Sequence, residues 1–130
     1  VFELLGISTA VVTDGSEAQV ARLVRLTAQD ALLAVGFRKA HPQAVAFLQA
    51  AAEQGSGTLA ITDNSLSELA GKADVTLFAD IDSTFFAHSL VGPLSLVGAL
   101  AGAVYARDRE GFDARLRAVR GHVADSGWLK

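Results

Sequence analysis

Cysteine is absent from this sequence of 130 residues. That absence excludes disulfide bonds, thiolate chemistry and zinc sites built on cysteine. A cluster with metal-ligand spacing, a nucleophile elbow and a Gly-x-Gly-x-x-Gly fingerprint are absent from the sequence as well, so it predicts neither a metal nor a cofactor. Nothing in this composition argues for secretion, and a cytoplasmic location is the default expectation.

An excess of basic residues is also lacking. The chain has 11 Lys and Arg against 14 Asp and Glu, which is a formal net charge of -3. This balance provides no electrostatic footprint for DNA or RNA across the domain as a whole. We therefore expect any DNA binding by the parent protein to reside in a separate segment.

The first residues do not form a signal peptide, because a basic region followed by an apolar core and a small-residue cleavage site is missing.

The chain is rich in apolar residues. Hydrophobic residues make up 51% of it, enough to fill one core, and its length suits one domain over residues 1–130.

A strand, a helix start and a second strand follow one another in the middle of the chain. Residues 57–62 form an uncharged apolar run typical of a strand covered on both faces. Ser65 and Glu68 have the spacing of a capping box, which predicts a helix over residues 65–72. Residues 75–78 are the next strand, so this stretch is one unit of a parallel α/β sheet.

The first part of the chain repeats this alternation. Residues 9–13 are predicted to be a strand that ends in an Asp-Gly turn, and a capping-box spacing at Ser16 and Gln19 predicts a helix over residues 16–26. Residues 31–35 are almost wholly apolar, so we expect a central strand with both faces covered.

The loop after this strand is the most informative stretch for chemistry. It contains Gly36, Arg38, Lys39 and His41, and Pro42 then fits the first turn of a helix. Free amides at the helix start, together with these basic side chains, would hold an anion such as phosphate. The alternative is a solvated basic loop in which His41 acts only near the helix cap.

A second wall of the same site is expected after the strand at residues 57–62, because ligands lie beyond the carboxyl ends of parallel strands. Its candidate ligand-binding residues are Thr62, Asp63, Ser65 and Ser67. Asp, Asn and Ser are also ordinary turn and cap residues, which is the competing interpretation.

Residues 85–106 carry no charged side chain apart from His88 and are long enough to cross a bilayer. We reject a membrane span because Pro93 and several glycines dilute the apolar run. A buried helix is the better interpretation. Gly98 and Gly102 share one face of it, which would let the sheet or a partner subunit approach closely.

The closing helix is predicted over residues 108–123. Its apolar face consists of Phe112, Leu116, Val119 and Val123. Asp113 and Arg117 have the spacing of an ion pair one turn apart. This helix is expected to cover the core.

The stretch ITDNSLSELAGKADVTLF, within residues 60–78, resembles the corresponding stretch of sugar isomerase (SIS) domains. The wider similarity, over about residues 4–120, is to the SIS domains of RpiR-type transcriptional regulators. The resemblance implies a flavodoxin-like, three-layer α/β/α fold. It also implies a homodimer packed through residues 85–106, and DNA binding only through a separate N-terminal domain.

The resemblance further implies a small, anionic ligand of the sugar-phosphate class. In family isomerases a Ser-x-Ser-Gly-x-Thr pattern holds the phosphate, but here those positions read Gly36, Arg38, Lys39 and His41. Where some of these enzymes have a glutamate base, this chain has Gln43, which cannot titrate. A non-catalytic sensing domain is therefore expected. A sugar-phosphate isomerase or related lyase is the alternative, and a flavodoxin-like or receiver-like interaction domain is a third.

Two residues near the start of the predicted long helix, Ser89 and His88, are also relevant to the resemblance to SIS domains. Ser89 matches the family's entry into that helix and would lie near the ligand. His88 could act as acid or base, as a histidine near this region does in a few isomerases, but a histidine on an apolar helix more often serves as a core or cap residue.

The amino terminus predicts missing sequence. Residues 1–6 resemble the last turn of a helix that ends at a glycine. Family SIS domains begin with one more strand before this helix, and in a 2-1-3-4-5 sheet it would lie between residues 9–13 and residues 31–35. We therefore expect the chain to be an incomplete SIS domain, with that strand supplied from elsewhere.

Overall fold

The computed structural model describes residues 1–127. It divides the chain into two compact units, one made of Val12–Leu96 and the other of Val1–Val11 together with the chain from Val97 onward.

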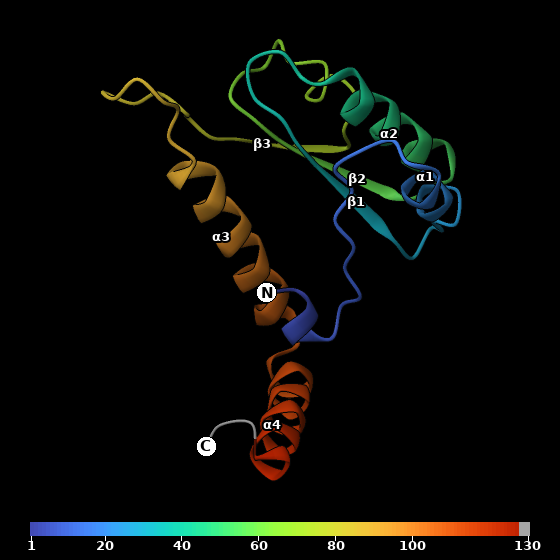
Figure 1. Cartoon of the computed structure of the whole chain (residues 1–130), viewed down its shortest axis with the longest axis vertical. Coiled ribbons are helices and arrows are strands. Elements are labelled where there is room, and N and C mark those ends of the chain that lie inside the picture. Colours follow the sequence, from blue (N-terminus) through green and yellow to red (C-terminus); the bar gives the residue numbers. More distant parts are fainter. Residues whose placement is uncertain (128–130) are drawn as a thin grey trace. The chain divides into compact units, whose positions relative to one another are not determined.

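A parallel sheet of three strands lies at the centre of the unit Val12–Leu96 (Figure 1). Its strands are β1 (Ala31–Val35), β2 (Gly57–Thr62) and β3 (Val75–Phe78), in the order β1-β2-β3. In the register of the sheet, Ala34 lies beside Ala60 and Ile61 beside Leu77. Three of the four predicted strands, at residues 31–35, 57–62 and 75–78, and the parallel α/β class are therefore confirmed.

Within this chain β1 does not have the predicted central place in the sheet. We expected a central strand with both faces covered, but β1 is at one edge, and the central strand is β2. Val35 accordingly leaves 48% of its surface exposed, whereas Ala60 and Ile61 on β2 are fully buried. An apolar run indicates a strand that needs cover, but it does not say which neighbours provide it.

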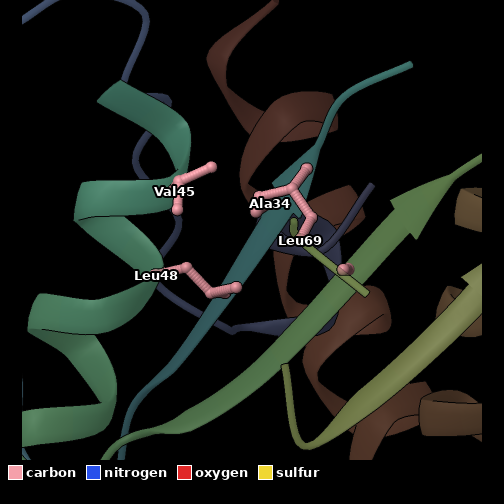
Figure 2. Close-up of a cluster of buried hydrophobic side chains, with 5 residues drawn as sticks. Ala34, Val45, Leu48 and Leu69 are labelled. Atoms are coloured by element: carbon pink, nitrogen blue, oxygen red, sulfur yellow. The ribbon is translucent and has the colours of Figure 1, made fainter. Parts of the chain in front are cut away.

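Helix α2 (Pro42–Glu53) packs on β1 and β2, and helix α1 (Glu17–Leu23) contacts α2. Figure 2 shows Val45 and Leu48 on α2 facing Ala34 of β1, with Leu69 beside them. Leu48 and Leu69 are fully buried. Burying a leucine side chain stabilises a fold by about 2 kcal/mol, so this cluster holds the helix on the sheet.

Residues 9–13 do not form a strand, contrary to the prediction. The backbone N–H groups of Thr13 and Asp14 donate to Oε1 of Gln19 at 2.8 and 3.0 Å, so a side chain occupies donors that a sheet would use. Because its side chain makes these bonds, Gln19 does not form the predicted capping box. Helix α1 ends at Leu23, three residues before the predicted end at residue 26. That another strand lies beside β1 stays a prediction.

The predicted helix over residues 65–72 is also wrong, because the structure has a series of turns there. Asn64 Oδ1 accepts the backbone N–H of Leu66 at 3.0 Å, and Ser67 Oγ accepts that of Leu69 at 3.3 Å. Short polar side chains that bond nearby backbone groups compete with a helix in this way. The turns still bring Leu69 into the core.

The second unit contains a 3-10 turn, η1 (Glu3–Leu5), and helix α4 (Arg109–Ser126). The turn ends at Gly6, whose φ of 76° is left-handed, as the glycine predicted. It packs on α4, where Arg115 Nη1 donates to the carbonyl oxygen of Leu5 at 3.4 Å and its guanidinium lies 5.1 Å from the Phe112 ring centre. Asp108 caps α4 by accepting the N–H of Gly111.

Helix α3 (Val91–Arg107) belongs partly to each unit. It starts six residues later than the predicted helix, and much of its apolar surface is exposed, including 71% of Val91 and 68% of Leu94. The prediction of a buried helix is therefore wrong for this chain alone. Within residues 1–127, the structure contains no helix that combines the length and the apolar character needed to cross a membrane.

Candidate functional site

The carboxyl ends of the three strands form the edge at which the sequence places its candidate site. Beyond the strand ends, Gly36 N–H donates to the Ile61 carbonyl and Ala79 N–H to that of Thr62, each at 3.0 Å. These bonds extend the sheet by one residue on either side of β2. The loops after β1 and β2 therefore begin side by side, as expected for parallel strands.

A hydrogen bond joins these two loops. The backbone N–H of Arg38 donates to Oδ1 of Asp63 at 2.8 Å. Arg38 has a φ of 57°, in the left-handed region that non-glycine residues seldom adopt and that costs roughly 1–3 kcal/mol. The bond to Asp63 helps to hold this conformation, which fixes where the Arg38 side chain leaves the backbone.

Asp63 is itself held by neighbours. Its Oδ1 also accepts from the Thr62 hydroxyl at 3.4 Å and from the Asn64 side-chain amide at 3.1 Å. Partial burial would raise the pKa of Asp63, but the hydrogen bonds from the backbone N–H of Arg38 and its own, and from the Asn64 and Thr62 side chains, together lower it. The carboxylate is therefore ionised at neutral pH.

The start of α2 differs from the expected anion-binding helix end. His41 caps the helix, with its Nδ1 accepting the N–H of Gln43 at 3.3 Å. The N–H groups of Ala44 and Val45 donate to the His41 carbonyl, and Pro42 has none. The expectation of free amides there is wrong, because these donors are already paired, so an anion would rely on Arg38 and Lys39.

Arg38 and Lys39 both have exposed side chains. Arg38 Nη2 lies 3.4 Å from Nδ1 of His88, which is exposed as well. His88 was interpreted mainly as a core or cap residue, and the structure instead places it beside Arg38. Nothing local in the sequence could show this contact, since the two residues are 50 positions apart.

Most of the remaining candidates make structural contacts. A Cβ on Gly36 would lie 2.9 Å from Cδ1 of Leu69, so a larger residue there would have to displace the end of this buried side chain. Thr62 is fully buried and Ser67 almost so, with the Ser67 hydroxyl accepting from Leu69. Ser89 Oγ accepts the N–H of Val91 at the start of α3, while Ser65 is exposed.

The structure thus brings together Gly36, Arg38, Thr62 and Asp63, with Lys39 next in the loop and Ser89 next to His88. Their roles in ligand binding stay predictions. Among residues 1–127, the structure shows no group of three or more His, Cys, Asp or Glu placed to hold a metal ion.

Comparison with known protein families matches residues 1–103 to the SIS domain. The chain belongs to the SIS domain family. A crystal structure of the sugar isomerase domain of an RpiR transcription factor from Sphaerobacter thermophilus is similar, with 34% identity and a TM-score of 0.82. The similarity covers 92% of this chain and 66% of that chain, so this SIS domain spans slightly less than two thirds of its relative.

A second crystal structure, of a hypothetical protein, matches with 20% identity and a TM-score of 0.56 over 70% of this chain and 56% of that one. At that identity the match supports the fold alone. No curated protein matches the sequence. The resemblance to the SIS domains of RpiR-type regulators is therefore confirmed by the family match and the first of these structures.

Proposed function

We propose that this SIS domain is the sensing module of an RpiR-type regulator and binds a small, phosphorylated, sugar-type metabolite without catalysis. The observation that carries the proposal is the pair of exposed basic side chains, Arg38 and Lys39, at the carboxyl ends of the strands. The Arg38 backbone N–H donates to Asp63 at 2.8 Å, so the backbone position from which the Arg38 side chain extends is fixed. Similarity to a regulator's sugar isomerase domain supports the ligand class.

The local chemistry favours binding over isomerisation. An aldose-ketose isomerase needs a base whose pKa suits proton abstraction from carbon. Gln43 cannot titrate, and its side-chain amide packs against the backbone of Gly15. The pKa of Asp63 is lowered and its Oδ1 already accepts hydrogen bonds from its neighbours, which makes it a weak base.

The proposal includes a homodimer formed through α3. Val91 and Leu94 are largely exposed, and Gly98 and Gly102 follow Leu94 at intervals of four residues, on the same face. Apart from the nearby backbone of α3 itself, a Cβ at either glycine would meet no atom of residues 1–127 within 4 Å, so this face is open to close approach by a second backbone. A partner helix would cover the apolar surface that this chain leaves exposed.

The remaining parts of the proposal concern the whole protein. The chain, with both of its units, would be one SIS domain in the cytoplasm, and DNA would be bound by a separate N-terminal domain. Ligand binding here would then alter the arrangement of the dimer, and with it the spacing of the DNA-binding domains.

A thermal-shift measurement tests the ligand. Glucose 6-phosphate at low ionic strength should raise the melting temperature, whereas glucose should not, because binding to the folded state stabilises it by mass action. Arg38→Ala should remove the shift, while Arg25→Ala, which removes the same charge from an exposed site outside the loop, should keep it. An equal shift in both variants would refute the role of Arg38.

The alternative, a sugar-phosphate isomerase, is tested separately by following interconversion of aldose and ketose phosphates by NMR. We expect no conversion above the background rate. Turnover that disappears in Asp63→Asn would favour the enzyme and identify its base.

A further inference from the structure

Arg38 and His88 approach one another across the carboxyl edge of the sheet. Arg38 lies in the loop after β1, and His88 lies in the segment that follows β3. Because β1 and β3 flank β2, the 3.4 Å contact between Arg38 Nη2 and His88 Nδ1 spans the end of the central strand. That is also the end at which Asp63 holds the Arg38 backbone.

This contact has a defined protonation requirement. An arginine guanidinium donates only, so His88 Nδ1 must be the acceptor, and the ring proton of a neutral imidazole is then on Nε2. A neutral acceptor orients the guanidinium without cancelling its charge. A carboxylate in the same place would orient it equally well but would neutralise it.

Asp63, the carboxylate bonded to Arg38, uses the backbone N–H of that residue. The guanidinium has five N–H donors, of which the contact with His88 uses one, at Nη2. Arg38 is therefore anchored at its backbone by Asp63 and at its tip by His88. Such an anchored guanidinium loses less conformational entropy when it binds a ligand.

We infer that His88 is a positioning residue of the anion site: it holds the Arg38 guanidinium over the end of β2, charged and with donors free for a phosphate monoester. This inference rests on the proposed function, because it assigns a role within the same site. It predicts that the neutral acceptor at position 88, and not the imidazole as such, sets the affinity.

The test is calorimetric titration of the full chain with inorganic phosphate and with glucose 6-phosphate at low ionic strength, where exposed charges are screened least. The variants are His88→Ala, which removes the acceptor, His88→Asn, which keeps a neutral one, and His88→Asp, which makes it charged. His122→Ala, at an exposed site on α4, is the matched control. Circular dichroism checks that each variant is folded, which we expect because His88 is exposed.

His88→Ala should weaken glucose 6-phosphate binding about fivefold, the effect of losing one orienting hydrogen bond. His88→Asp should weaken it by about tenfold or more, since the carboxylate competes for the same charge. His88→Asn and His122→Ala should bind like the wild type. Recovery in His88→Asn distinguishes a positioning role from nonspecific damage to the loop.

Three results would overturn the inference. If the wild type binds and His88→Ala binds as tightly, His88 does not position Arg38, and the proposed function stands. If the wild type binds neither phosphate nor glucose 6-phosphate, the proposed ligand class and this inference fail together. Tighter binding by His88→Asp would also contradict the role, because a carboxylate beside Arg38 should compete with the anion for the guanidinium.

Discussion

Asp63 accepts the backbone N–H of Arg38 at 2.8 Å, and this bond joins the loops after β1 and β2 across 25 positions of sequence. Through this contact the loop after β2 fixes the backbone of an exposed basic residue. A backbone bond of this kind leaves the arginine side chain free, so the loop can be rigid while its charge remains available to a ligand.

Asp63→Ala should destabilise the fold by about 1–3 kcal/mol, because it removes an acceptor shared by several donors and leaves the buried Thr62 hydroxyl without it. Urea denaturation measures the change. Asp80→Ala is the control, since Asp80 is exposed and its side chain accepts the N–H of Asp82, two residues away. Equal stability of the two variants would contradict the importance of the loop contact.

Arg38→Gly separates the backbone from the side chain. Glycine adopts a φ of 57° without strain and keeps the N–H that donates to Asp63, so the free energy of unfolding should change by less than about 1 kcal/mol. Anion binding should be lost with the guanidinium. A large loss of stability would show that the Arg38 side chain, and not only its backbone, holds the loop.

The stability of the domain should depend on pH through Asp63. Its pKa is lowered in the folded state relative to the ordinary value of 3.8, so its contribution is present above that value and is lost as the pH falls through the folded-state pKa. Denaturation at a series of pH values should show a weaker dependence in Asp63→Asn in the acidic range.

Some acid dependence should remain in that variant. The pKa of Asp74 is also lowered, because the Thr58 backbone N–H and hydroxyl donate to it, and hydrogen bonds likewise lower those of Asp14 and Asp30. An Asp63→Asn variant whose pH profile coincides with that of the wild type would show that Asp63 contributes nothing to the dependence.

Leu69→Ala should destabilise the unit Val12–Leu96 by about 2–5 kcal/mol, since the side chain is fully buried and a cavity would remain. Leu66→Ala is a matched control three residues away, because Leu66 is 93% exposed and its truncation should cost almost nothing. Thermal or urea unfolding distinguishes them. Similar losses in both would mean that the turns after β2 do not direct Leu69 into the core.

Gly98→Leu or Gly102→Leu should weaken the proposed dimer, because a leucine on that face of α3 would prevent close approach of the partner. Light scattering at micromolar concentration gives the oligomeric state. Gly121→Leu, on α4 at a site with equally open surroundings, should leave the dimer intact. A wild-type chain that is monodisperse and monomeric would refute the dimer.

Local patterns in the sequence were sufficient for three of the four predicted strands and for the start of α2. The apolar runs at Ala31–Val35, Gly57–Thr62 and Val75–Phe78 all became strands, and Pro42 opens α2 as its fixed φ requires. These features depend on the conformational preferences of a few adjacent residues, so they can be predicted from a short segment of sequence.

The capping-box spacings were less reliable. Ser65 and Glu68 have the right separation, yet Asn64 and Ser67 bond the backbone within turns and no helix forms. Gln19 bonds the backbone of Thr13 and Asp14 in place of its own helix start. Short polar side chains can bond several nearby backbone groups, and spacing alone does not decide which of these bonds forms.

The sequence by itself determined the parallel α/β class, the three strands and the basic loop. Tertiary structure decided that β1 lies at the edge, that Asp63 holds Arg38, and that His88 approaches the guanidinium from a segment 50 positions away. The physical reason is that strand order and loop contacts depend on which distant segments pair, and the propensities of neighbouring residues carry no information about that pairing.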